Sequence, residues 1–146
     1  MTSEAEIADL SIQLAVTVAF VLLNVVMHSS GLVGISRLLH LRDESSIPNE
    51  FGLRASVLMG SYGLLLFALH FAEIFVFALF YHFVAAMHPL EAALFYSASC
   101  YATLGSVNGG FSQEWRLVGS LEALIGFVLI GWSTAFMVRT LRRIID

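Results

Sequence analysis

Two residues of a long apolar segment, His70 and Glu73, have side chains that could do chemistry together. They are three positions apart, so on a helix they share one face and lie within hydrogen-bonding reach. A carboxylate in an apolar helix must face protein or water, pair with another group, or take up a proton. The pair therefore suits a proton-sensitive or metal-binding site, or a structural link to a neighbouring helix.

The remaining histidines form no compact ligand set and include no HExxH motif. They are His28, His40, His82 and His88. We expect these rings to lie at membrane interfaces, where their polar edges reach water. Metal sites need convergent His or carboxylate groups, so a membrane metalloenzyme built on His70 and Glu73 is a rival interpretation without motif support.

The composition indicates an integral membrane protein. Of 146 residues, 58% are hydrophobic and 12% charged, against about 45–50% and about 25% in soluble domains. Acidic residues number 11 and basic residues 7, and the formal charge of -4 argues against nucleic acid as a partner. The single cysteine, Cys100, can form no intrachain disulfide, and we expect a buried, inert thiol.

Three segments are long enough to cross a bilayer, which takes about 20 apolar residues. The first helix is expected from Ala8 to His28, with Ser29–Gly31 and the residues after it as an extension or an interfacial segment. The second is expected from Leu53 to Phe83 and the third from Trp115 to Leu141. The resulting units are an N-terminal transmembrane helix at 1–36, a polar linker at 37–54 and a third unit at 55–146.

The segment between the second and third spans is too short to cross the membrane. Pro89 and Glu91 suit the start of a helix, which is predicted at 90–102. A Gly-containing stretch then interrupts it after about four turns. A half-length helix followed by extended chain at membrane depth is typical of a re-entrant loop, which must be buried in protein or line a water-filled cavity. The sequence therefore predicts a pore domain at 55–146.

The arginines fix the expected orientation. Six of them flank the linker or end the chain: Arg37, Arg42, Arg54, Arg139, Arg142 and Arg143. The positive-inside rule places both regions in the cytoplasm and the N-terminus outside. The N-terminal tail lacks the basic start of a signal peptide. We expect a multi-pass protein of the cell membrane, the inner membrane in a Gram-negative organism.

Two stretches carry a family resemblance. ALFYSASCYATLGSVN (Ala93–Asn108) resembles a pore helix running into a filter, and WRLVGSLEALIGFVLIGWSTAF (Trp115–Phe136) resembles an inner helix. With the outer helix at His70–Phe83, the chain is similar to the two-helix pore domains of the prokaryotic potassium-channel family, and to its short bacterial members with an extra N-terminal helix. This resemblance covers Phe51 to Arg143. It implies an all-α homotetramer with three transmembrane helices and one re-entrant pore helix per subunit.

The predicted filter departs from the Thr-Val-Gly-Tyr-Gly of that family, whose carbonyl oxygens replace the hydration shell of the ion. The aligned residues here are Thr103, Leu104, Gly105, Ser106 and Val107. A β-branched residue at positive φ is an outlier, so Val107 is not expected to replace the second glycine. Ser106 lacks the aromatic ring that packs behind the strand. We therefore expect a widened outer filter and ion coordination mainly at Thr103 to Gly105.

Further residues are expected to support, gate or surround this filter. The resemblance assigns filter support to Phe95 and Tyr96. Glu122, two turns into the third span, is expected to brace the pore helix, and Glu73 and Glu122 are candidates for pH-dependent gating. Glu91 is expected to interact with the amide groups of its own helix. The outer mouth is expected to include Asn108, where the family usually has Asp, with Glu114 and Arg116.

Two glycines of the third span have alternative roles. Gly126 and Gly131 either form a hinge for an inner gate or allow close helix approach. If this helix lines a cavity, Ile130 and Thr134 continue the row from Gly126, and Thr134 offers a hydroxyl to a hydrated ion.

These observations predict a tetrameric channel for monovalent cations, weakly selective or non-selective between K⁺ and Na⁺. The expected partners are membrane lipid and further copies of the chain. No enzyme activity, cofactor or resident metal is expected apart from the permeant ions. The alternatives are a potassium-selective channel and a non-conducting channel-like subunit.

Overall fold

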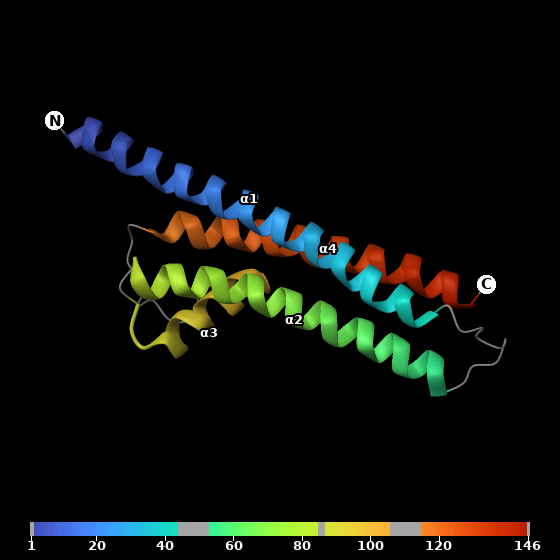
Figure 1. Ribbon diagram of the computed structural model, residues 1–146. Helices are drawn as coiled ribbons and strands as arrows, with labels where there is room; N and C mark the ends of the chain where they lie inside the picture. Colours follow the sequence, from blue (N-terminus) through green and yellow to red (C-terminus); the bar gives the residue numbers. More distant parts are fainter. Residues whose placement is uncertain (1, 44–52, 85–86, 106–114, 146) are drawn as a thin grey trace.

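The computed structural model describes residues 2–43, 53–84, 87–105 and 115–145, and its regular structure there is entirely helical (Figure 1). The four helices are α1 (Thr2–Asp43), α2 (Leu53–Phe83), α3 (Leu90–Tyr101) and α4 (Arg116–Ile145). Three of them contain stretches long and apolar enough to cross a membrane: Asp9–Leu39, Ser56–Phe83 and Arg116–Thr140. The expectation of an all-helical chain with three such helices is confirmed, and it indicates a membrane protein.

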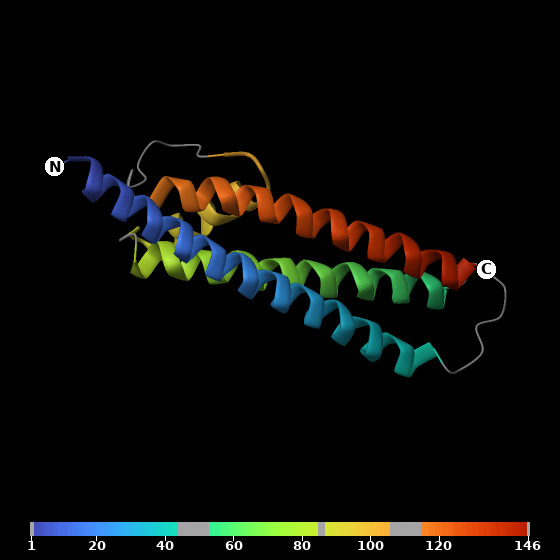
Figure 2. The same cartoon turned by 90° about the horizontal axis from the view of Figure 1, so that it is seen from above.

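The three long helices lie side by side, and short α3 packs against α2 and α4 in one half of the bundle (Figures 1 and 2). α3 begins beside the end of α2, and its last residue, Tyr101, reaches Glu73 near the middle of α2. Trp115, directly before α4, packs against Phe80 near the end of α2, with ring centroids 5.1 Å apart. The chain therefore runs into the bundle as α3 and has returned to the same end where α4 begins.

In α1 the residues after His28 are an extension of the helix, which is one of the two alternatives expected for them. The helix continues without a break to Asp43, over 42 residues, or about 63 Å at 1.5 Å per residue. The hydroxyls of Ser29 and Ser30 donate to the carbonyl oxygen of Val26, at 3.1 Å and 2.7 Å. Because the helix itself satisfies these polar side chains, they do not end it. Residues 37–43, expected in the linker, are therefore helical.

The other helix bounds follow the sequence closely. α2 has the expected bounds, and α3 ends one residue before the expected position 102. α4 begins one residue after the expected start and continues to Ile145 instead of Leu141. Pro89 occupies the N-cap position of α3, where its fixed φ suits the entry into a helix.

Two apolar clusters hold the long helices together. The first lies where α2, α3 and α4 meet and includes the buried side chains of Phe77, Tyr81, Ala93, Val118 and Leu129, with Phe20 of α1 packed against it. The second joins α1 to α2 nearer the linker and consists of Leu32, Ile35, Leu39, Tyr62 and Leu66. The first cluster therefore fixes α3 in the bundle.

The two glycines of α4 have different surroundings. A Cβ atom added to Gly126 would lie 2.5 Å from the carbonyl oxygen of Tyr101, whereas one added to Gly131 would meet no atom within 4 Å. Gly126 thus allows the backbone of α4 to approach the end of α3. Among the described residues of the chain, Gly131 has no such role.

We predict that Gly126→Ala lowers the free energy of unfolding by about 1–3 kcal/mol, because backbone atoms of α3 must move. Gly131→Ala is the matched control, and its stability should stay equal or rise by up to about 1 kcal/mol, since alanine favours a helix. Thermal unfolding of both variants in detergent measures the difference. Equal midpoint temperatures for the two variants would contradict this packing.

Candidate functional site

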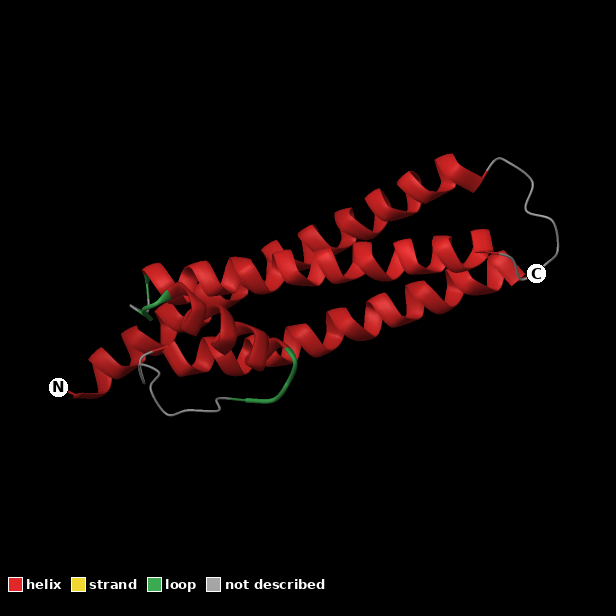
Figure 3. Ribbon diagram, turned by 90° about the horizontal axis from the view of Figure 1, so that it is seen from below, coloured by secondary structure: helices red, strands yellow, loops and turns green. Residues whose placement is uncertain are grey.

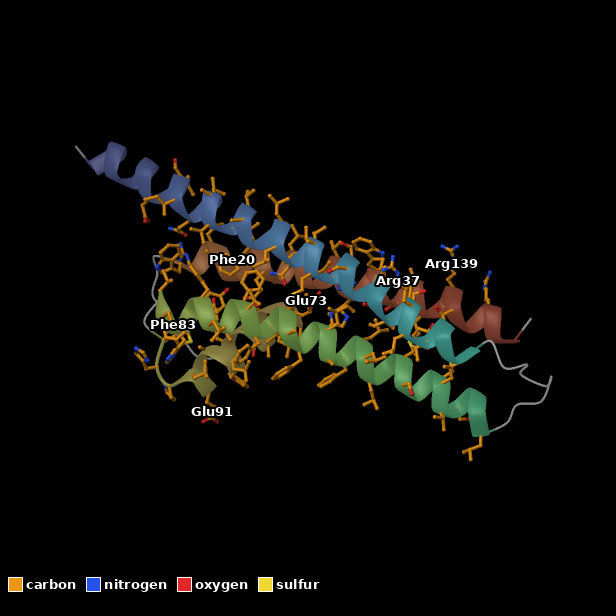
Figure 4. All side chains as sticks on the ribbon, in the orientation of Figure 1. Phe20, Arg37, Glu73, Phe83, Glu91 and Arg139 are labelled. Carbon is orange, nitrogen blue, oxygen red and sulfur yellow. The ribbon has the colours of Figure 1, made fainter. Side chains whose placement is uncertain are left out.

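Polar side chains from all four helices meet around the carboxylate of Glu73, near the middle of the long helices (Figure 4). This Glu73 cluster consists of His28 of α1, His70 and Glu73 of α2, Tyr101 of α3 and Ser133 of α4. The side chains of Glu73 and His28 are 0% exposed, and that of His70 is 17% exposed. The carboxylate is therefore shielded from lipid, as the sequence requires.

The geometry of the cluster surrounds one carboxylate with donors. His28 Nδ1 lies 2.8 Å from Glu73 Oε1, and the Tyr101 hydroxyl donates to Oε2 at 2.5 Å. His70 Nδ1 lies 3.1 Å from Oε2 and 2.8 Å from the Tyr101 oxygen. A buried carboxylate is costly unless it is paired and hydrogen-bonded. Here the hydrogen-bond partners of the Glu73 carboxylate come from α1, α2 and α3. These hydrogen bonds therefore also constrain how the three helices pack.

A second buried carboxylate, Glu122 of α4, contacts the middle of α3. The Tyr81 hydroxyl donates to Glu122 Oε2 and the Ser97 hydroxyl to Oε1, each at 2.5 Å. Ser97 Oγ also lies 2.8 Å from the carbonyl oxygen of Ile74 in α2. Its single proton can serve one acceptor at a time. The structure therefore places Glu122 against the short helix, where the sequence led us to expect it.

The two carboxylates hold α3 along one face. Ala93, Ser97 and Tyr101 are all buried and are spaced four residues apart, so they form one row on the helix. Ser97 meets Glu122 and Tyr101 meets Glu73, one helical turn farther on. The sequence shows Ser97 and Tyr101 one turn apart, but Glu91 and Ser99 of the same helix are polar as well, so spacing alone does not single out this row.

The end of α3 has the hydrogen bonds of a Schellman motif. The amide of Thr103 donates to the Cys100 carbonyl at 2.8 Å, and that of Leu104 donates to the Ser99 carbonyl at 2.9 Å. Thr103 has φ 62° and Gly105 has φ 77°. Glycine usually takes the position of Thr103 in this motif, and a β-branched residue there stores strain of about 1–3 kcal/mol. The sequence analysis considered a positive φ only at the glycine positions of the family filter. It therefore did not predict the positive φ of Thr103.

Residues 102–105, which follow α3, are on the outside of the chain (Figure 3). Thr103, Leu104 and Gly105 are exposed, and 75% of Leu104 is accessible. Of the other expected filter and mouth residues, Ser106, Val107, Asn108 and Glu114 lie outside the described part of the chain. Arg116 is exposed at the start of α4.

The aromatic residues of α3 are divided between the core and a groove. Tyr96 packs edge-on against Tyr81, with ring centroids 4.9 Å apart, and beside Gly119 of α4. Phe95 is 58% exposed and lines a cavity of about 620 Å³ between α2 and α3. Tyr96 thus supports α3 from the inside, whereas Phe95 does not pack into the protomer.

The remaining expected residues lie apart from these clusters. Glu91 is exposed in the first turn of α3 and points away from the bundle in Figure 4. Gly126 is buried against α3, whereas Ile130 and Thr134 are exposed. The Thr134 hydroxyl donates to the Ile130 carbonyl at 2.9 Å.

His28 corrects our placement of the scattered histidines at interfaces. It is fully buried, and its second ring nitrogen, Nε2, lies 3.3 Å from Ser133 Oγ. The spacing of polar residues in the sequence could have indicated the burial of His28. Four of them share one face of α1, and all are buried: Gln13, Thr17, Asn24 and His28. His82 accords better with the expectation, since it is partly buried near the end of α2, beside His88.

No family model, no curated protein and no solved structure matches the chain. The comparisons therefore identify no family. The likeness to potassium-channel pore domains rests on the quoted residues alone, and the functional argument rests on the geometry of the chain.

We predict that Ser97→Ala destabilises the protein by about 1–2 kcal/mol, because it removes a donor from the buried Glu122 carboxylate. Ser99→Ala is the matched control, since among the described residues this buried hydroxyl bonds to the Phe95 carbonyl of its own helix alone, at 2.8 Å. Its effect should stay within about 0.5 kcal/mol. Thermal unfolding in detergent compares them, and an equal loss in both variants would show that Ser97 does not anchor α3.

Proposed function

We propose that the chain forms a tetrameric channel for monovalent cations, with α3 as its pore helix and Thr103–Gly105 in the ion pathway. One observation carries this proposal. α3 enters half of the bundle and ends at the buried Glu73, and an exposed segment with positive φ at Thr103 and Gly105 follows it.

The length of α3 supports a re-entrant helix. Its 12 residues span about 18 Å, against about 30 Å for the hydrocarbon core. Backbone groups at that depth must be buried in protein or face water. Thr103–Gly105 are exposed in the single protomer, so further copies of the chain around a water-filled axis would satisfy them. A fourfold arrangement, as in the resembling family, meets this need.

The charges near the end of α3 favour cations. The C-terminal end of a helix carries the negative end of its dipole. Glu73 lies beside this end, and among the described residues its carboxylate has no Arg partner. The local field therefore attracts cations and repels anions.

The proposed selectivity follows from the altered filter. Thr103 to Gly105 keep the inner part of the family pattern, whereas Ser106 and Val107 replace the outer Tyr and Gly. Fewer coordination sites in series discriminate less between K⁺ and Na⁺. We therefore favour a weakly selective or non-selective pore over a potassium-selective one. The other alternative is a non-conducting channel-like subunit, which would assemble but pass no ions.

The orientation is proposed from the arginines. Arg37 and Arg139 lie toward the same end of the bundle, away from α3, in Figure 4. The positive-inside rule assigns that end to the cytoplasm. α3 then enters the membrane from the outside, as does the N-terminus of α1.

Silver ions test the ion pathway directly, because Ag⁺ is a small monovalent cation that forms a bond with a cysteine sulfur and displaces its proton. In planar bilayers with nitrate salts, Ag⁺ should lower the cation current of Leu104→Cys at least tenfold. Leu22→Cys is the control, because Leu22 is 61% exposed on α1 and is expected to face lipid. Its current, like that of the wild type with its buried Cys100, should persist.

Two results would contradict the proposal. One is the absence of any cation current from folded wild-type protein. The other is equal sensitivity of the Leu104→Cys and Leu22→Cys currents to Ag⁺, because that would place Leu104 outside the pathway.

A further inference from the structure

Three metal-ligating side chains converge in the Glu73 cluster. The ligand atoms of His28, His70 and Glu73 all lie within 4.8 Å of one another. Both imidazoles turn the same ring nitrogen, Nδ1, toward the same carboxylate. The Tyr101 hydroxyl adds an oxygen 2.8 Å from His70 Nδ1 and 2.5 Å from Glu73 Oε2. Two nitrogens and two kinds of oxygen thus surround one small volume.

The proton positions permit two states of this cluster. Without a metal, each neutral imidazole can donate its Nδ1 proton to the carboxylate, and Ser133 can donate to His28 Nε2. With a metal, both Nδ1 lone pairs must face the ion, so the proton moves to Nε2. Ser133 Oγ, 3.3 Å from His28 Nε2, can then accept a hydrogen bond from that N–H. Such a partner on the far nitrogen is the usual support of a metal-bound histidine.

A metal ion could reach the cluster from the groove between α2 and α3. His70 belongs to the cluster and also lines this cavity of about 620 Å³, together with Phe67, Phe71 and Phe95. His70 is 17% exposed, whereas Glu73 and His28 are fully buried. The His70 ring therefore connects the groove to the carboxylate.

We propose that His28, His70 and Glu73 form a binding site for a divalent zinc-like ion, with Ser133 positioning His28. Two imidazoles and one carboxylate are a ligand set that zinc accepts, with a fourth position left for Tyr101 or water. The single negative charge of the set suits a divalent cation. Bound metal would link α1, α2 and the end of α3. This site does not depend on the proposed channel function.

Equilibrium dialysis of the purified full-length protein against Zn²⁺, followed by metal analysis, tests the site. We expect one Zn²⁺ per chain, which His28→Gln and His70→Gln should abolish. Ser133→Ala should weaken the affinity about 10–100-fold, as other losses of a supporting partner do. His82→Gln is the matched control, because this histidine lies outside the cluster, with Nδ1 3.0 Å from the Met87 carbonyl. It should retain the full stoichiometry.

Several outcomes would overturn the proposal. They are absence of Zn²⁺ binding by folded wild-type protein, unchanged binding in the cluster variants, and loss of binding in His82→Gln. X-ray absorption of the zinc-loaded wild type identifies the ligands of the bound ion and needs no variant. Two imidazoles with oxygen ligands are expected, and a shell that contains sulfur or only water oxygen contradicts the site. His28→Cys loaded with Co²⁺ should gain a thiolate-to-metal absorption band that the wild type lacks.

Discussion

A carboxylate buried in the middle of apolar helices must be surrounded by hydrogen-bond donors, and this constraint organises the structure around Glu73. Its donors come from α1, α2 and α3, and Ser133 of α4 contacts one of them, His28. The packing of the N-terminal helix and the depth reached by α3 are thus coupled to one side chain. Removal of one donor would leave the others around a poorly satisfied charge, which is costly in a low-dielectric interior.

Glu122 is a second buried carboxylate surrounded by donors, which are the hydroxyls of Ser97 and Tyr81. Ser97 lies one turn of α3 before Tyr101, which contacts Glu73. The two carboxylates fix the short helix on one face and leave Thr103 to Gly105 exposed beyond its end. Glu73 lies beside the C-terminal end of α3, where the helix dipole is negative. The contacts that hold α3 therefore place a carboxylate beside the end of α3 that the proposed ion pathway uses.

Local signals in the sequence predicted the helix bounds better than the contacts between helices. Pro89 and the Gly-containing stretch located α3. Of the two alternatives for the residues after His28, the structure has the helical extension, in which the serine hydroxyls bond within α1. The contact between His70 and Glu73 followed from their spacing. The role of His28 did not, because its partner is 45 residues away in the sequence and no motif spacing encodes how two long helices pack. Thr103 shows that the local hydrogen bonds at the end of a helix can hold a β-branched residue at a positive φ.

The most direct test of the account is the reversal potential of the reconstituted protein under a bi-ionic gradient of K⁺ and Na⁺, with chloride varied separately. A cation pore that keeps only the inner part of the filter predicts a reversal near zero that does not respond to chloride. A reversal that follows the chloride gradient would contradict a cation pathway at the end of α3. A reversal at the potassium equilibrium potential would show instead that Thr103 to Gly105 suffice for selectivity, contrary to the proposed weakening.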